Sequence, residues 1–214
     1  MYLDTMMHLA LDIDPKAGSA LKSMFRQEAA ISVLELGTGT GIAGLFLASI
    51  KAHCSCLLTD VGEAMELLNL NVSTAALKQG STVTTTVLDW EKPVPSDVER
   101  ERFDLIVISD CTYNPDTVKA LVGTLTSLMQ LSPHAIALVA MKVRHESEMV
   151  FFEIMSEAGL VQLEECSVPL SKCSADGGAE ALERVDVYAY GLGGGSCILG
   201  PADESERTLA VSGS

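Results

Sequence analysis

Three glycines preceded by a carboxylate are the first residues in the chain whose spacing points to ligand chemistry. Gly37, Gly39 and Gly41 follow an apolar run and precede a segment with helical periodicity. Glycines at such a strand-to-helix turn let a ligand approach the backbone, because no Cβ keeps it away. The dinucleotide pattern Gly-x-Gly-x-x-Gly fails here, since Ile42 stands where its third glycine belongs. Glu35, two residues before the first glycine, would repel a pyrophosphate and favour a positively charged ligand.

A carboxylate and an aromatic ring follow the next two predicted strands. Asp60 lies 19 residues after Gly41, where a carboxylate in an α/β fold can accept hydrogen bonds from both hydroxyls of a ribose. Trp90 is the single tryptophan, and its ring could either wall an adenine site or pack in the core. Taken alone, Asp60 could equally cap the next helix, and the glycine turn could bind nothing. Together they predict a site for a nucleoside without a pyrophosphate.

An acid and an aromatic residue three positions apart follow the fourth predicted strand. Asp110 ends a buried apolar run and Tyr113 comes shortly after it. A carboxylate and a ring placed in this way can flank a cation, one through its charge and the other through its ring face. A protonated amine is such a cation. The alternative is a strand-end cap at Asp110 and a packed aromatic at Tyr113.

The elements that must position these residues alternate between short β-rich runs and longer helical stretches, which is typical of a doubly wound α/β sheet. Asn114 before Pro115 predicts a helix start, because an Asn cap and a proline at the first helical position favour the opening turn. Strands are expected over 31–36, 56–59, 83–88, 104–109 and 135–141, a closing antiparallel pair over 160–168 and 185–191, helices over 16–28, 41–50, 62–77, 114–130 and 146–157, and a surface connection over 91–102.

Composition limits the class of protein. The chain has 214 residues, of which 48% are hydrophobic and 20% charged, as expected of one globular domain. Acidic residues outnumber basic ones 29 to 14, and the net charge of −15 argues against nucleic-acid or membrane-surface partners. The apolar runs are too short for a membrane span, and the N-terminus lacks a secretory signal. We therefore expect a cytoplasmic protein that is also nuclear, with its six cysteines reduced and mostly buried and no zinc pattern among them.

The motifs, taken in order, resemble family 16 of the seven-strand S-adenosylmethionine (SAM)-dependent methyltransferases, which are mainly protein-lysine methyltransferases. The resemblance rests on residues 34–41, 58–60, 69–72, 88–90, 104–106 and 110–113. It implies a Rossmann-like α/β fold with a seven-stranded, mostly parallel sheet, a closing antiparallel hairpin and helices on both faces. It also implies SAM as cofactor, direct methyl transfer to a lysine amine and no metal.

The resemblance assigns roles to individual residues. Gly37, Thr38 and Gly39 would hold the methionine part of the cofactor, Asp60 the ribose, and Trp90 with Ser109 the adenine. Asp110 and Tyr113 would lie beside the acceptor amine, and Arg144 would be a structural anchor. The full predicted cofactor set is Glu35, Gly37, Thr38, Gly39, Gly41, Asp60, Trp90 and Ser109.

The front of the chain departs from the family, which usually has a longer leader with a tryptophan close to the cofactor. We expect a short leader over 1–15, a methyltransferase domain over 16–191 and a flexible tail over 192–214. The expected protein is a monomer, and the resemblance points to chaperones, elongation factors and AAA-type ATPases as substrates.

Three other functions stay open. A small-molecule methyltransferase would share the cofactor site but should replace the Asp-x-x-Tyr motif. An adenine or glutamine-amide methyltransferase should have two prolines where Cys111 and Thr112 stand. A degenerate methyltransferase fold that serves as a binding module would agree with the short leader.

Overall fold

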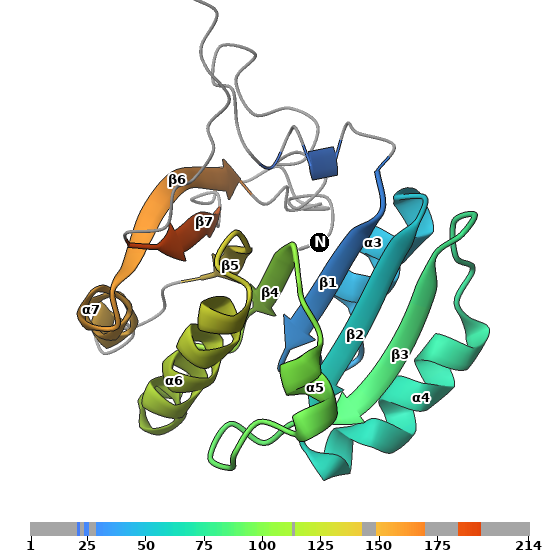
Figure 1. Ribbon diagram of the computed structural model, residues 1–214, viewed down its shortest axis with the longest axis horizontal. Coiled ribbons are helices and arrows are strands. Elements are labelled where there is room, and N and C mark those ends of the chain that lie inside the picture. The colour runs from blue at the N-terminus through green and yellow to red at the C-terminus, as the bar shows by residue number, and fades with distance from the viewer. Residues whose placement is uncertain are drawn as a thin grey trace, which may run out of the picture.

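Seven strands form one sheet in the computed structural model of the chain, which describes residues 21, 24, 25, 29–112, 114–142, 149–169 and 184–193 (Figure 1). Their order across the sheet is β3-β2-β1-β4-β5-β7-β6. β1 to β5 are parallel, whereas β7 pairs antiparallel with both β5 and β6. The predicted Rossmann-like sheet with a closing antiparallel pair is therefore confirmed. The strands are β1 (Ile31–Leu36), β2 (Cys54–Asp60), β3 (Thr82–Val87), β4 (Leu105–Ser109), β5 (Ile136–Met141), β6 (Leu160–Pro169) and β7 (Arg184–Leu192).

Helices cover both faces of this sheet, as predicted. Figure 1 shows α6 in front of the strands and α3 behind them. Two buried clusters result: one joins the sheet to α6 and α7, and the other joins it to α3 and α4. The helices are α3 (Ile42–Ile50), the short 3-10 helix η1 (Gly62–Ala64), α4 (Met65–Thr74), α5 (Ser96–Arg100), α6 (Pro115–Leu131) and α7 (Val150–Glu157).

The central strands are mostly apolar and almost completely buried because both of their faces are covered. In β1, Val33 packs in the cluster on the α3 side, while Leu34 and Leu36 pack in the cluster on the α6 side. Every residue of β5 is buried. The edge strand β3 is instead rich in threonine and partly exposed. The core therefore lies over β1, β4 and β5, next to the strand ends that carry the predicted site.

The strand order reverses between β1 and β4, which are neighbours in the sheet. From β1 the connections lead through β2 to β3 on one side, and from β4 to β5 on the other. Helices leave the carboxyl ends of these two strands in opposite directions, and ligands of open α/β sheets bind at such a switch point. The topology therefore places the ends of β1 and β4 at the centre of the candidate site.

Apart from shifts of one residue, three predictions need correction. β2 begins at Cys54, two residues early, because Cys54 pairs in register with Ile31. The helix predicted over 62–77 begins as η1 and ends at Thr74, since the next residue is extended. The connection predicted over 91–102 contains α5. Of the helix predicted over 146–157, the part from Val150 to Glu157 is confirmed as α7, and residues 146–148 lie outside the described residues.

Several predictions fall on residues outside the described part of the chain. Of the helix predicted over 16–28, Leu21, Met24 and Phe25 are described and are helical. The leader over 1–15 and nearly all of the tail over 192–214 are not described. None of the described helices is long and apolar enough to cross a membrane.

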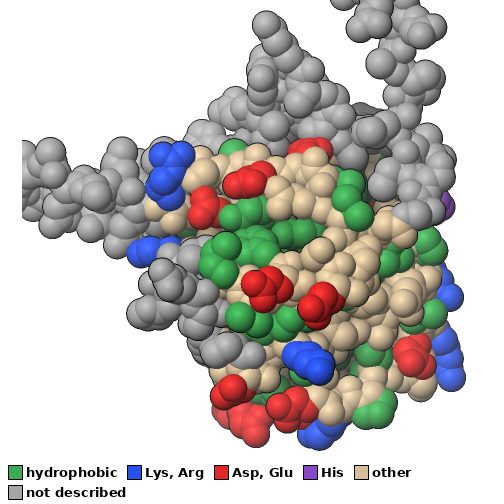
Figure 2. Space-filling view, turned by 90° about the vertical axis from the view of Figure 1, so that its left-hand side faces the viewer, with side chains coloured by type: hydrophobic (Ala, Val, Ile, Leu, Met, Phe, Trp, Pro, Cys, Tyr) green, Lys and Arg blue, Asp and Glu red, His purple; other side chains and the backbone are tan. Residues whose placement is uncertain are grey.

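The surface agrees with the acidic composition. On the side of the molecule shown in Figure 2, acidic side chains lie above and below an apolar area, with basic side chains among them. The elements α7 and β6 lie on this side (Figure 1) and expose Val150, Val161 and Leu163, and Met149 is exposed just before α7.

The start of α6 provides a test of the local sequence prediction. The Asn114 side chain accepts a hydrogen bond from the Asp116 backbone N–H at 3.1 Å, and Pro115 occupies the first helical position. Asn114→Ala should lower the free energy of unfolding by about 1 kcal/mol, because an alanine cannot satisfy that N–H. Chemical denaturation measures this loss. Thr126→Ala, in the middle of the same helix, is the control, and an equal loss in both variants would contradict the cap.

Candidate active site

The glycine turn after β1 has the backbone that the sequence predicts. Gly37, Gly39 and Gly41 have φ angles of 65°, 55° and 81°, in the left-handed region that favours glycine. The Thr38 N–H donates to the Thr59 carbonyl oxygen at 3.0 Å, and the Gly41 N–H to the Thr38 carbonyl oxygen at 2.9 Å. These bonds fix the turn to the end of β2 and to the start of α3.

Gly37 is also the point of closest packing in the turn. A Cβ at this position would lie 2.7 Å from both the Cys111 Sγ and Cζ2 of the Trp90 ring. At Gly39 a Cβ would meet nothing within 4 Å. Gly37 is thus needed for its left-handed conformation and because a Cβ has no room there, whereas Gly39 is needed for its left-handed conformation alone.

This difference gives a paired prediction. Gly39→Ala should lower the free energy of unfolding by about 1–2 kcal/mol, which is the cost of the left-handed conformation. Gly37→Ala should lower it by about 1–3 kcal/mol more, because the added methyl group overpacks against Cys111 and Trp90. Urea denaturation of both variants checks the order. Equal losses of unfolding free energy in the two variants would contradict the prediction, because they would mean that Cys111 and Trp90 move aside for the methyl group at no cost.

Glu35 faces away from the cleft, toward α3. Its Oε2 accepts a hydrogen bond from the Gly44 N–H at 2.8 Å, and its side chain is buried. Gly44 lies in the first turn of α3, whose N–H groups lack partners within the helix. Burial raises the pKa of Glu35 to about 7. Glu35 therefore supports the turn from below, and its predicted contact with the cofactor stays a prediction.

The raised pKa makes stability depend on pH. Glu35 binds its proton more tightly in the folded protein than in the unfolded chain, whose ordinary value is 4.5. Its stabilising contribution is therefore complete below pH 4.5 and is lost as the pH rises through 7. Glu35→Gln cannot ionise, so this variant should gain stability relative to the natural protein between pH 5 and 8, by on the order of 3 kcal/mol. Denaturation of both proteins across this range measures the gain, and parallel curves would contradict it.

Asp60 ends β2 and joins the glycine turn. Its Oδ2 accepts a hydrogen bond from the Gly39 N–H at 2.7 Å, and its Oδ1 one from the Val61 N–H at 2.7 Å. It makes no side-chain cap to the following η1. The carboxylate thus links β2 to the glycine turn and lines a cavity, and its contact with a ribose stays a prediction.

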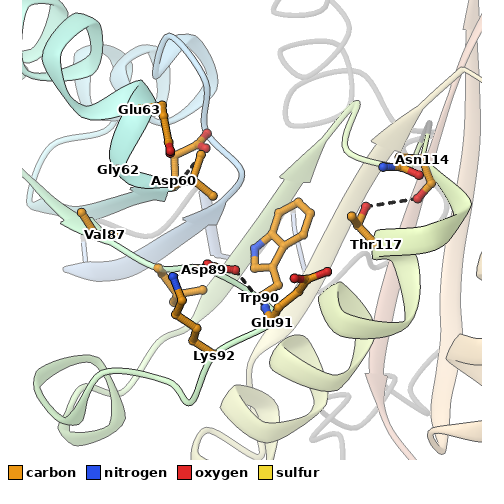
Figure 3. Close-up of a pocket in the computed structure, with 12 residues that line it drawn as sticks. Asp60, Gly62, Glu63, Val87, Asp89, Trp90, Glu91, Lys92, Asn114 and Thr117 are labelled. Atoms are coloured by element: carbon orange, nitrogen blue, oxygen red, sulfur yellow. Dashed lines mark hydrogen bonds and ion pairs between the residues drawn. The ribbon is translucent and has the colours of Figure 1, made fainter.

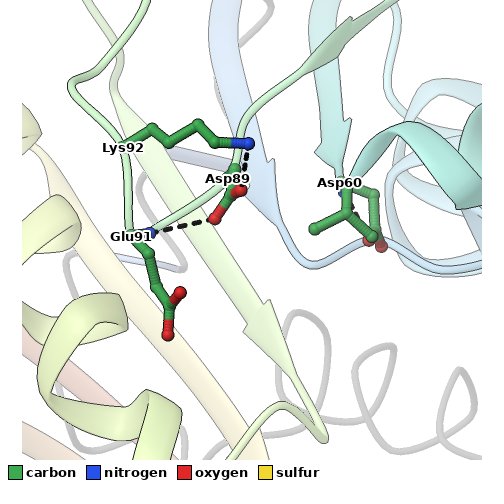
Figure 4. A network of polar contacts seen from close by, with 5 residues as sticks. Asp60, Asp89, Glu91 and Lys92 are labelled. Atoms are coloured by element: carbon green, nitrogen blue, oxygen red, sulfur yellow. Dashed lines mark hydrogen bonds and ion pairs between the residues drawn. The ribbon is translucent and has the colours of Figure 1, made fainter.

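That cavity has a volume of about 650 Å³ and lies at the carboxyl ends of β2 and β3 (Figure 3). Four of its twelve lining residues are acidic. Among the described residues around it, Lys92 is the one cation, and its Nζ lies 2.7 Å from the Asp89 Oδ2 (Figure 4). The cavity is therefore electronegative. Its lining residues are Asp60, Val61, Gly62, Glu63, Val87, Leu88, Asp89, Trp90, Glu91, Lys92, Asn114 and Thr117.

Trp90 both lines the cavity and packs in the core, the two alternatives that the sequence left open. Its ring lines the cavity and also packs against the core cluster on the α6 side. Its Nε1 is buried and has no hydrogen-bond partner among the described residues. A buried N–H without a partner is costly, so a ligand that accepts a hydrogen bond at this point would be favoured.

The end of β4 contains the predicted acceptor residues. Asp110 has a φ of 55°, which is rare for a residue other than glycine, and its N–H donates to the Ala140 carbonyl oxygen at 2.8 Å. Strained backbone of this kind occurs at functional sites, where the surrounding structure holds it. Ser109 is the last residue of the same strand. Tyr113 and Arg144 lie outside the described residues.

Sequence reasoning gave no role to Cys111, which the structure places under the glycine turn. Its Sγ lies 3.3 Å from the Gly37 carbonyl oxygen and 3.5 Å from that of Leu36. Burial raises its pKa to about 12, so the thiol stays protonated and can donate to these oxygens. Its position two residues after a strand end was the available signal. The same signal would have found Asp89, which lies two residues after the end of β3, but not Lys92.

The residues of this edge fit SAM. The cofactor has a net positive charge, and the cavity is electronegative. Gly39 leaves the backbone open to a ligand, Asp60 supplies carboxylate oxygens, and the Trp90 N–H has no partner among the described residues. No cluster of three or more metal-ligating side chains occurs within the part of the chain that the structure describes.

Comparison with known proteins identifies the family. A family model described as lysine methyltransferase matches residues 3–158. Over 130 residues the chain is 29% identical to the calmodulin-lysine N-methyltransferase of Arabidopsis thaliana. This alignment covers 60% of this chain and 42% of that protein. Over 127 residues the chain is 32% identical to EEF1A lysine methyltransferase 3 of Mus musculus, which covers 58% and 52%. The chain thus spans about half the length of these curated relatives.

A solved structure gives the same fold. The model superimposes on a SAM-dependent methyltransferase of Methanosarcina mazei with a TM-score of 0.59 and 16% identity, covering 82% of this chain and 98% of that one. At this identity the likeness concerns the fold alone. The family match covers well over half of the chain, and the seven-stranded fold agrees with it, so this chain belongs to the lysine methyltransferase family, whose cofactor is SAM.

Proposed function

We propose that this protein is a SAM-dependent protein-lysine N-methyltransferase that transfers a methyl group directly to a lysine amine. The observation that carries the proposal is the position of Asp110. It directly follows β4 in a left-handed conformation, one residue before the thiol that packs under the glycine turn. This arrangement holds a carboxylate at the switch point of the sheet, where open α/β sheets bind their ligands.

Asp110 serves to recognise and align the amine. A free lysine is protonated at pH 7, and removal of its proton costs about 4.6 kcal/mol from a pKa near 10.4. A carboxylate stabilises the ammonium form of the lysine and so opposes its deprotonation. Asp110 is therefore not the group that promotes formation of the neutral amine. Desolvation of the lysine in the site favours the neutral amine instead. The carboxylate then holds the nitrogen in line for transfer.

The other site residues hold the cofactor. SAM supplies an electrophilic methyl carbon on a positively charged sulfur. The turn at Gly37 and Gly39 would accommodate its methionine part, Asp60 its ribose, and Trp90 with Ser109 its adenine. Glu35 and Cys111 support that turn from the sides away from the cavity.

We further propose a protein substrate among chaperones, elongation factors or AAA-type ATPases. Two relatives are named as methyltransferases of calmodulin and of EEF1A, which supports a folded protein as substrate. The net charge of −15 favours a target lysine in a basic surface. We propose a monomer that acts in the cytoplasm and also in the nucleus.

One experiment separates these ideas. The purified chain is incubated with labelled SAM and a cell extract, and the labelled proteins are identified by mass spectrometry. Label on a lysine of one main protein supports the proposal, and label on small molecules supports the alternative enzyme. Binding of SAM without any transfer would make the chain a binding module and would overturn the proposed activity.

A further inference from the structure

Two thiols on β2 lie within hydrogen-bonding distance of each other. The Sγ atoms of Cys54 and Cys56 are 3.3 Å apart, and both residues are free cysteines that are almost completely buried. They alternate with the exposed Ser55 and therefore project from the same face of the strand. The site described above uses neither of them.

The surroundings of the pair favour one thiolate. The thiols share a hydrogen bond, which lowers the pKa of Cys54 and raises that of Cys56, and the positive charge of Lys51 acts in the same direction on Cys54. The backbone N–H of Cys54 donates to the Ser81 Oγ at 3.1 Å. On the other side, the Cys56 Sγ lies 3.6 Å from the Gly44 carbonyl oxygen. The pair is thus enclosed between the start of β2 and the first turn of α3.

The strand geometry opposes a direct disulfide. Residues two apart on a strand have Cβ atoms about 6.6 Å apart, whereas a disulfide needs them about 3.8 Å apart. A single bridging atom removes this conflict. With bonds to sulfur of about 2.3 Å, as for thiolate ligands of zinc, a separation of 3.3 Å gives an angle of about 90° at that atom. A linear two-coordinate ion would need the sulfurs about 4.6 Å apart. Trivalent arsenic is pyramidal and has angles near a right angle.

The geometry points to a dithiol site at Cys54 and Cys56 that takes a trivalent arsenic compound as a bridging ligand. In the reaction with phenylarsine oxide, two As–S bonds form and the bond from arsenic to oxygen breaks. The two thiol protons leave with that oxygen as one water molecule. Arsenic stays trivalent and both sulfurs keep their oxidation state, so no oxidant or reductant is needed.

Occupation of the pair should disturb α3. The phenyl-bearing arsenic needs space next to the Gly44 carbonyl oxygen, and the N–H of the same residue holds Glu35. The Cα of Gly44 is closely packed as well, because a Cβ there would overlap the Leu58 side chain and lie 2.7 Å from the Glu35 Oε2. The adduct should therefore loosen the first turn of α3, which lies directly behind the glycine turn.

The test uses the full chain and phenylarsine oxide, with intact-mass and peptide mass spectrometry. We expect one adduct per chain, heavier by one phenylarsine group less two hydrogens and mapped to the peptide that contains both cysteines. A dithiol such as dimercaptopropanol should reverse it, whereas the same concentration of glutathione should not. Cys54→Ser and Cys56→Ser should each lower the apparent affinity at least tenfold, while Cys166→Ser, Cys173→Ser and Cys197→Ser should leave it within twofold.

A second measurement avoids dependence on variants that fail to fold. Hydrogen–deuterium exchange of the natural chain should speed up at least tenfold over residues 42–50 on adduct formation, and stay within twofold over residues 115–131. An adduct at other cysteines, or none in the folded protein, would overturn the site. An adduct at Cys54 and Cys56 with unchanged exchange in α3 would overturn the coupling to that helix.

Discussion

Asp110→Asn is expected to lower the rate of lysine methylation about 10- to 150-fold and to leave the affinity for SAM within about threefold of the natural protein. This range corresponds to the loss of one charged hydrogen bond to the aligned amine, which contributes about 1.5–3 kcal/mol. The loss should fall on kcat/KM for the protein substrate, because the amide can still accept a hydrogen bond but no longer attracts the ammonium by charge.

The choice of asparagine keeps the backbone out of this comparison. Asp110 has a φ of 55°, and asparagine adopts this region more readily than most residues. Alanine would add backbone strain to the loss of the carboxylate, so that its effect could not be assigned.

Asp116→Asn provides the matched control. It removes a carboxylate from the first turn of α6, a few residues away from Asp110. This variant should keep methylation within about threefold. Equal losses in both variants would mean that general charge near the site matters, and an unchanged rate in Asp110→Asn would remove Asp110 from the acceptor site.

Asp60→Ala is expected to lower the affinity for SAM about 10- to 100-fold, as measured by isothermal titration. The substitution removes the charged acceptor for the ribose hydroxyls, whose hydrogen bonds contribute about 1.5–3 kcal/mol. It also leaves the Gly39 N–H without the acceptor that now lies 2.7 Å away. Both effects act on the same turn, so this variant should show the largest loss of cofactor binding.

Asp60→Asn separates the two effects. Its amide oxygen can still accept from the Gly39 N–H, so the turn should persist while the negative charge is lost. We expect this variant to lose less affinity than Asp60→Ala. Asp89→Asn, which lines the same cavity but is paired with Lys92, should change the affinity by less than about threefold. If Asp89→Asn lost as much as Asp60→Ala, the cavity would act through its total charge, and the specific role of Asp60 would be wrong.

Local patterns in the sequence were sufficient for most of the fold. The boundaries of β1 agree with the prediction, because a strand buried on both faces is a mostly apolar run, and this one ends at the glycine turn. The start of α6 agrees because the Asn114 cap and Pro115 are local signals. The short α5 was missed because its five residues lie in a polar stretch with two prolines, too short to show helical periodicity.

The sequence by itself also determined which residues meet at the site. Residues that end parallel strands lie along one edge of the sheet, so Gly37, Asp60, Trp90 and Asp110 were expected together from the alternation of strands and helices. What it could not determine was the direction of each side chain. Glu35 shares a face with Val33 and is thereby directed to α3, and this depends on which face α3 covers.

Contacts between distant residues were likewise decided by the tertiary structure alone. The Cys111 thiol reaches the Gly37 carbonyl oxygen across 74 positions of sequence, because β4 pairs with β1 in one particular register. The Asp60 carboxylate reaches the Gly39 N–H only because β2 ends beside the turn. Periodicity predicts the face of a strand on which a side chain lies, but strand register and the side of each crossover determine which groups come within hydrogen-bond distance.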